Sequence, residues 1–185
     1  MSSFFASDWH LGHSNIIKYD KRPFKSIEEM NETIITNHNK VVTYEDDWYF
    51  LGDFAFNKDK KIVEEWMNRI IGNKFFIRGN HDHSDTRKLY AKYGTYLGEQ
   101  AEIQIEGQSI VLNHYAMRVW NKSHRGAWHL YGHSHHSLPE EPNSLSFDVG
   151  CNGWNYEPLS FERVKEKMSK KTWRAIDHHT GRHNQ

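Results

Sequence analysis

The sequence predicts a protein of the α/β (α+β) class, in which helices cover β-sheets. Two observations support this class. Short apolar runs alternate with amphipathic patches of helical period in the first half of the chain, whereas short strand-like runs follow one another in the second half. The 185 residues are enough for a single domain with a substantial core, which we expect over residues 1–176. A disordered tail, rich in His and Asn, is expected at 177–185.

Helices are expected where apolar residues recur every three or four positions. The segment 26–42 begins with a capping box, in which Ser26 and Glu29 satisfy free amide groups of the first turn. The amphipathic segment 60–71 is followed by Gly72, a residue typical of the position just after a helix. Two shorter helices are expected at 84–93 and 160–168.

Strands are expected at short runs of β-branched, aromatic and aliphatic residues. The segments 101–105 and 109–113 flank Glu106-Gly107-Gln108, which predicts an antiparallel hairpin. A strand–helix–strand first half followed by this hairpin-rich second half favours sheets covered by helices. The remaining strands are expected at 3–7, 48–51, 75–78, 128–131, 145–149 and 172–176.

Composition and charge narrow the class of function. Lys plus Arg and Asp plus Glu number 24 each, so the formal net charge is zero, which argues against electrostatic binding of nucleic acid. The single Cys151 forms no internal disulfide and builds no thiolate zinc site alone. Because the N-terminus does not resemble a signal peptide and no apolar run approaches the ~20 residues of a membrane span, we expect a cytoplasmic protein.

Metal-ligating residue types follow five of the expected strands. Fourteen histidines are more than the packing of such a domain requires, and several occupy these places. In open α/β sheets, sites form outside the carboxyl ends of strands, where loops from several strands converge. The sequence therefore predicts a metal centre at one rim of the sheets. In chain order the motifs are Asp8-Trp9-His10, Gly52-Asp53, Gly79-Asn80-His81-Asp82, Asn113-His114 and Gly132-His133-Ser134-His135.

The donor types narrow the choice of metal. Imidazole, carboxylate and an amide oxygen, without thiolate, suit Mn, Fe, Zn, Ni or Co. Seven candidate ligands are too many for one ion with open positions, and they suit two ions that share a carboxylate. Two ions about 3.5–4 Å apart clamp the attacking and leaving oxygens of a displacement at phosphorus.

This ordered series of motifs resembles the calcineurin-like metallophosphoesterase superfamily, over residues 8–135. The resemblance implies a four-layer αββα sandwich of two mixed β-sheets flanked by helices. One position departs from the family pattern, because Phe56 stands where many members have a further Asp three residues after the shared one. By resemblance, one ion is held by Asp8, His10 and His135, a second by Asn80, His114 and His133, and both by Asp53.

The same resemblance assigns catalytic roles within the Asn-His-Asp loop. His81 matches the histidine that protonates the leaving oxygen without binding metal, and Asp82 matches its orienting partner. Two neighbouring residues are candidate substrate contacts. His13 either contacts a substrate phosphate or caps its loop, and Arg78 either binds phosphate or forms a structural ion pair.

These features predict a metal-dependent phosphoesterase that hydrolyses a phosphate mono- or diester, with a small diester or nucleotide favoured. The nucleophile would be a hydroxide held by two divalent ions, with Mn favoured. Two alternatives stay open, namely a nuclease acting on DNA or RNA and a non-catalytic interaction module on the same fold. Zero net charge weighs against the nuclease, and the complete set of ligand positions weighs against the module.

Overall fold

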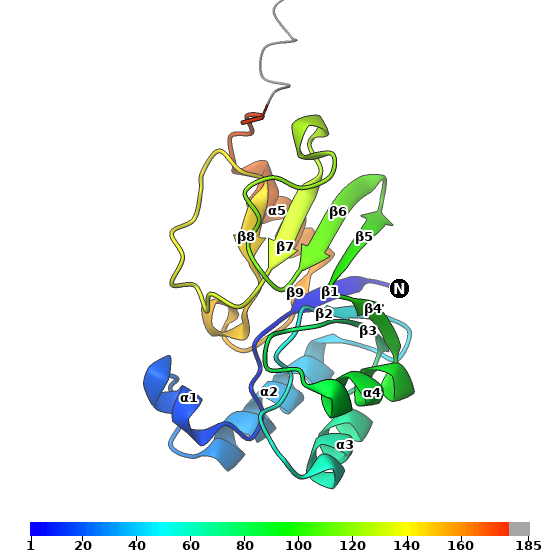
Figure 1. Cartoon of the computed structure of the whole chain (residues 1–185), viewed down its shortest axis with the longest axis vertical. Helices are drawn as coiled ribbons and strands as arrows, with labels where there is room; N and C mark the ends of the chain where they lie inside the picture. Colours follow the sequence, from blue (N-terminus) through cyan, green and yellow to red (C-terminus); the bar gives the residue numbers. More distant parts are fainter. Residues whose placement is uncertain (178–185) are drawn as a thin grey trace, which may run out of the picture.

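The computed structural model describes residues 1–177 and contains two mixed β-sheets (Figure 1). The first sheet consists of β1 (Ser3–Ala6), β2 (Asp47–Phe50), β3 (Asn73–Ile77), β4 (Thr95–Gly98) and β9 (Leu159–Ser160). Its spatial order is β4-β3-β2-β1-β9, in which β1 to β4 are parallel and β9 is antiparallel to β1. The carboxyl ends of β1, β2 and β3 therefore lie at the same edge.

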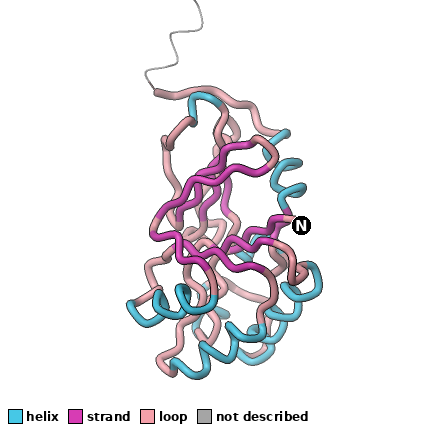
Figure 2. The backbone as a smooth tube through the Cα atoms, turned by 90° about the vertical axis from the view of Figure 1, so that its right-hand side faces the viewer, coloured by secondary structure: helices cyan, strands magenta, loops and turns pink. Residues whose placement is uncertain are grey.

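The second sheet consists of β5 (Gln100–Ile105), β6 (Gln108–Asn113), β7 (Trp128–Tyr131) and β8 (Ser146–Asp148). Its order is β5-β6-β7-β8, with an antiparallel β5–β6 hairpin followed by parallel pairing of β6, β7 and β8. Figure 2 shows the two sheets one above the other, with helices below the first. The expected fold class and hairpin are therefore confirmed.

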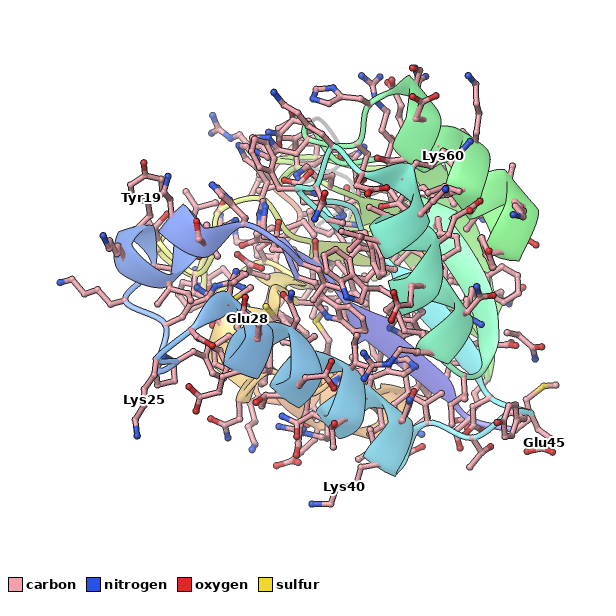
Figure 3. The ribbon with its side chains drawn as sticks, turned by 90° about the horizontal axis from the view of Figure 1, so that it is seen from below. Tyr19, Lys25, Glu28, Lys40, Glu45 and Lys60 are labelled. Carbon is pink, nitrogen blue, oxygen red and sulfur yellow. The ribbon has the colours of Figure 1, made fainter. Side chains whose placement is uncertain are left out.

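Most helices cover the outer face of the first sheet. Figure 3 shows this layer from below, with charged side chains such as Lys25, Glu28 and Lys40 directed to solvent. The bounds are α1 (Ser14–Tyr19), α2 (Ile27–Val41), α3 (Lys60–Arg69), α4 (Ser84–Tyr93) and α5 (Phe161–Ser169). As expected, α2 begins at an N-cap, because the Ser26 hydroxyl accepts the amide of Glu29 at 3.1 Å.

Two apolar cores lie on opposite faces of the first sheet. Trp48 and Phe50 of β2 pack with Met30 and Ile34 of α2 in the core beneath the sheet. Tyr49 of β2 belongs to the other core, which the second sheet and α5 share. Alternate residues of one strand thus point to opposite cores, as the two-residue period of a strand requires. This double burial fixes the register of the strands whose ends carry the site.

The strand expected at 172–176 is wrong. The segment is irregular and runs beside the loop that precedes β8, since the amides of Thr172 and Arg174 donate to the carbonyls of Pro142 and Asn143. The indole of Trp173 donates to the carbonyl of Ser123. Its aromatic and aliphatic residues therefore cover a loop instead of joining a sheet.

The sequence did not predict the short helix α1, the strand β4, which pairs with the edge of β3, or the two-residue strand β9, which pairs with β1. The helix expected at 60–71 ends at Arg69, because Ile70 already has extended backbone.

The single domain over 1–176 stays a prediction, and the tail expected at 177–185 lies outside the described residues except for Asp177. Across residues 1–177, no helix is long and apolar enough to cross a membrane, and the cytoplasmic location stays a prediction.

Candidate metal centre

The carboxyl ends of three neighbouring parallel strands form one side of the candidate metal centre. Asp8 lies two residues after β1, whereas Asp53 and Asn80 lie three residues after β2 and β3. Backbone hydrogen bonds join these loops, because the amides of Asp8 and His10 donate to the carbonyls of Gly52 and Asp53, both at 3.0 Å. The segments that carry the polar side chains therefore run side by side.

The second sheet supplies the other candidate ligands from its own strand ends. His114 directly follows β6, whereas His133 and His135 follow β7. The amide of His133 donates to both carboxylate oxygens of Asp8, at 3.0 and 3.1 Å, which joins the loop after β7 to the first sheet. The structure thus brings together all seven side chains expected as ligands, at the rim where the two sheets meet.

Asp8, His10 and His135 form a first donor group, with one donor atom from each lying within 4.8 Å of the others. The Nε2 atoms of His10 and His135 are 3.1 Å apart, and Nε2 of His135 lies 3.6 Å from Oδ1 of Asp8. Two donors that are each about 2.1 Å from one ion lie about 3.0–3.6 Å apart at angles between 90° and about 120°. The spacing of this group therefore suits a single metal ion.

Asn80, His114 and His133 form a second donor group. Oδ1 of Asn80 lies 3.0 Å from Nε2 of His114 and 2.8 Å from Nδ1 of His133. The Asp53 carboxylate stands between the two groups, since its Oδ2 lies 3.4 Å from Nε2 of His114 and 3.7 Å from Nε2 of His10. Donor atoms of Asp8, Asp53 and His114 also lie within 4.8 Å of one another. The structure therefore contains Asp/His clusters that could hold metal, and Asp53 contacts a histidine of each donor group.

Hydrogen bonds on the far side of two imidazole rings direct their donor atoms into the centre. Nδ1 of His114 donates to the carbonyl of Leu51 at 2.7 Å. Nδ1 of His135 donates to the carboxylate of Asp20 at 2.5 Å. Each bond fixes the ring and leaves Nε2 for a metal, which is the usual support of a metal-bound histidine.

The electrostatics of the site also fit bound cations. Burial raises the pKa of Asp8 to about 7 and lowers the pKa of His10 to about 3. Burial opposes the pKa shifts of Asp53 and His114, yet their mutual hydrogen bond and charges prevail and set the values at about 2 and about 9. A cation would stabilise both buried carboxylates, and it would have to displace the proton of His114.

The backbone at the candidate ligands is strained. Five of them have positive φ, a region in which residues other than glycine cost of order 1–3 kcal/mol each. The φ values are 60° for Asp8, 51° for His10, 60° for Asp53, 66° for His133 and 47° for His135. Such concentration of strain is typical of sites whose side-chain geometry is held by the surrounding fold.

His81 lies next to the metal-ligand candidates without joining either group. Its amide donates to Oδ1 of Asp53 at 2.8 Å. Its ring centroid lies 5.4 Å from that of His10 and 5.5 Å from that of Phe56, in edge-on arrangements. Phe56, at the position that departs from the family pattern, thus packs against this imidazole.

The role expected for Asp82 needs correction. Its buried carboxylate accepts the amides of Gly79 at 2.7 Å and of Asp53 at 2.9 Å. Among the described residues it makes no hydrogen bond with the imidazole of His81. Asp82 therefore holds the backbone of two ligand loops together and does not orient the ring.

The two candidate substrate contacts lie on different sides of the centre. The ring of His13 packs against Phe56, with centroids 4.5 Å apart, and lies 5.8 Å from the ring of His10. Arg78 forms an ion pair with Glu99, at 2.6 Å between Nη1 and Oε1. The structural ion pair considered for Arg78 is therefore present, and its contact with substrate stays a prediction.

Asp20, which follows α1 and supports His135, was not expected from the sequence. Besides the imidazole, Oδ2 of Asp20 accepts the side-chain amide of Asn152 at 2.9 Å and the guanidinium of Arg22 at 3.3 Å. An acidic residue just after a short helix carries no periodic or spacing signal. Only the folded chain shows that it lies beside the last motif.

Arg22 was missed for the same reason. It is only 4% exposed, and its guanidinium donates to the carbonyls of Asp8 at 2.8 Å and Trp9 at 2.9 Å. The same guanidinium contacts Asp20. Arg22 thus supports the strained first loop through its carbonyls and the last loop through Asp20 and His135.

Comparison with known proteins identifies the family. The model of the calcineurin-like phosphoesterase superfamily domain matches residues 1–155, which is most of the chain. The chain belongs to this superfamily. The resemblance expected from the five motifs is therefore confirmed.

Relatives of this superfamily member agree with the assignment. An uncharacterized protein of Methanocaldococcus jannaschii is 35% identical over 173 residues, which are 90% of this chain and 91% of that protein. A solved structure of a protein of unknown function from Aquifex aeolicus has a TM-score of 0.70 at 22% identity, over 90% of this chain and 98% of that chain. A solved structure described as a novel archaeal phosphodiesterase has a TM-score of 0.50 at 16% identity, over 87% and 99%. Both solved structures share the fold of this chain.

The contact between Asp20 and His135 leads to a prediction about metal affinity. Asp20→Asn removes the charge that stabilises the Nδ1 proton of His135, so the affinity for Mn²⁺ should fall by about 10–100-fold. Calorimetric titration with MnCl₂ measures this without any substrate. The control is Asp85→Asn, which removes an exposed carboxylate paired with Lys88 on α4 and should bind Mn²⁺ like the wild type. Equal affinity of Asp20→Asn and the wild type would show that Asp20 does not support the metal ligand.

Proposed function

We propose that this phosphoesterase binds two divalent transition-metal ions and hydrolyses a small phosphate diester. The observation that carries the proposal is the position of the Asp53 carboxylate, 3.4 Å and 3.7 Å from histidine nitrogens of two separate donor groups. A carboxylate placed in this way can bind two ions at once. Imidazole, carboxylate and amide donors without thiolate favour Mn, with Fe, Zn, Ni and Co as alternatives.

The ligands divide between the ions as their spacing suggests. When bound, the ions would polarise the phosphoryl oxygens and lower the pKa of a water molecule. Asp53 would contact both ions and hold them at a fixed separation. The first ion would be held by Asp8, His10 and His135, and the second by Asn80, His114 and His133.

His81 is the residue that we assign to proton transfer. Its amide is fixed by Asp53, and its imidazole faces the same rim as the donor groups. The ring makes no side-chain hydrogen bond within residues 1–177, so it is free to donate a proton to the leaving oxygen. His13 and Phe56 lie on this side of the centre, and the leaving group would depart past them.

A diester is favoured by the two cavities that flank the centre. One, of about 210 Å³, lies beside Asn80, and the other, of about 380 Å³, lies beside His133 and His135. A diester carries two alcohol groups, and the structural relative described as a phosphodiesterase supports the same class. The small cavities and the zero net charge argue against a nuclease with a long nucleic-acid footprint.

Hydrolysis assays on metal-free and metal-loaded protein test the proposal. The protein should bind two Mn²⁺ ions per chain by elemental analysis, and it should hydrolyse bis-p-nitrophenyl phosphate only when loaded. Asp53→Asn should lower both metal content and turnover more than any other single ligand change, because one carboxylate serves both ions. Full activity of the chelated protein, or no hydrolysis of any phosphate ester by the loaded protein, would refute the proposed function.

The assignment of His81 predicts a loss of turnover without a loss of metal. His81→Ala should retain two ions per chain while its turnover falls by ~10²–10⁴-fold. The loss should be smaller for p-nitrophenyl esters than for alkyl esters, because nitrophenolate leaves without protonation. The matched control is His83→Ala, an exposed histidine that precedes α4. If His81→Ala loses metal, the residue is a ligand and its assignment as the acid is wrong.

A further inference from the structure

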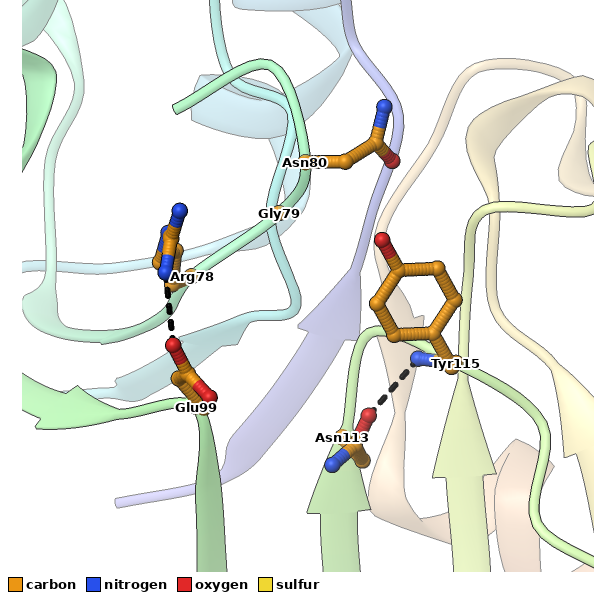
Figure 4. A pocket seen from close by; sticks show the side chains of 6 residues that line it. All are labelled: Arg78, Gly79, Asn80, Glu99, Asn113 and Tyr115. Atoms are coloured by element: carbon orange, nitrogen blue, oxygen red, sulfur yellow. Dashed lines mark hydrogen bonds and ion pairs between the residues drawn. The ribbon is translucent and has the colours of Figure 1, made fainter. Parts of the chain in front are cut away.

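A small cavity opens beside Asn80, at the junction of the two sheets (Figure 4). Its volume is about 210 Å³. Glu99, which joins β4 of the first sheet to β5 of the second, lies on one side, and Tyr115, just after β6, lies on the other. The cavity therefore adjoins the candidate metal centre through Asn80. Its lining residues are Arg78, Gly79, Asn80, Glu99, Asn113 and Tyr115.

Several polar atoms of this lining have no partner in the described part of the chain. Glu99 uses Oε1 for the ion pair with Arg78, which leaves Oε2 as an acceptor. Asn113 uses Oδ1 to accept the amide of Tyr115 at 2.8 Å, which leaves its side-chain NH₂ as a donor. The hydroxyl of Tyr115 points toward Asn80 and can both donate and accept (Figure 4).

The size and charge of the cavity limit what it can bind. Drug-sized ligands occupy cavities of about 300–1,000 Å³, so this one takes only a small group. A second phosphate is disfavoured, because the carboxylate of Glu99 neutralises Arg78 at 2.6 Å and would repel an anion. Adjacent acceptors and donors instead match hydroxyl groups, each of which donates one hydrogen bond and accepts others.

We propose that this cavity binds a small polyhydroxylated alcohol esterified to the substrate phosphate, such as a vicinal diol. The inference rests on the proposed phosphodiesterase function and names the alcohol that its substrate carries. Oε2 of Glu99 accepts a hydrogen bond from one hydroxyl group, while the side-chain amide of Asn113 and the hydroxyl of Tyr115 donate hydrogen bonds to the hydroxyl oxygens. A diol bound in this way is distinguished from a plain alkyl group, which makes none of these hydrogen bonds.

The cavity takes the alcohol that stays on phosphorus after cleavage. His81 does not line it, and the ring of His81 lies instead against His10 and Phe56. The leaving group must be near the proton donor, so it departs on the Phe56 side. The retained alcohol is then the one that reaches past Asn80 to Glu99 and Tyr115.

Two synthetic diesters with the same leaving group test this inference. Both are p-nitrophenyl phosphodiesters, and the second alcohol is 2,3-dihydroxypropyl in one and propyl in the other. The manganese-loaded full chain should hydrolyse both, with kcat/KM about tenfold or more higher for the dihydroxypropyl ester, the effect of one hydrogen bond to a charged group. Hydrolysis of both esters at equal kcat/KM overturns the diol subsite while leaving the phosphodiesterase function intact. Hydrolysis of neither ester overturns both.

Variants assign the preference to this cavity. In Glu99→Gln and in Tyr115→Phe the ratio of the two kcat/KM values should fall toward one. Glu102→Gln is the control, because this exposed carboxylate on β5 binds Asn121 away from the cavity and should keep the wild-type ratio. A wild-type ratio in both Glu99→Gln and Tyr115→Phe, with their metal content intact, would show that the diol binds elsewhere and overturn the assignment.

Discussion

The candidate metal centre depends on how closely the backbones of several strand ends approach one another. A Cβ on Gly79 would lie 2.1 Å from Oδ1 of Asp53, and a Cβ on Gly132 would lie 2.5 Å from Oδ2 of Asp8. No other residue type fits at either place without moving the carboxylates. These glycines directly precede Asn80 and His133, so the absence of two side chains allows donors from both sheets to reach a common centre.

Bringing charged groups into this junction costs free energy, which the fold offsets locally. A buried charge is tolerated when it is paired and hydrogen-bonded. Arg22 meets this condition through the carbonyls of Asp8 and Trp9 and through Asp20. The carboxylate of Asp8 is less well compensated, since burial raises its pKa to about 7. The burial of this carboxylate thus lowers the stability of the folded protein, but the donors are already in position when cations bind.

The sequence predicted the parts of the molecule that local patterns specify. The capping residues of α2 and the motifs that end in Asp53 and Asn80 are local signals, so the main helices and the order of the site residues could be derived from them. Long-range contacts carry no such signal: β4 forms because β3 offers a free edge, and Asp20 gains its contact with His135 only on folding. The carboxylate of Asp82 likewise accepts hydrogen bonds from amides of two separate loops. The position of Asp82 beside His81 in the sequence gives no indication of these contacts.

The central claim is that one carboxylate holds two metal ions in contact with donors from both sheets. Anomalous diffraction at the manganese edge from crystals grown with MnCl₂ tests it directly, because it locates the ions without reference to any substrate. We predict two peaks about 3.5–4 Å apart, one beside His10 and His135 and the other beside Asn80 and His114, with Asp53 in contact with both. A single peak, or two peaks of which only one contacts Asp53, would contradict the shared carboxylate.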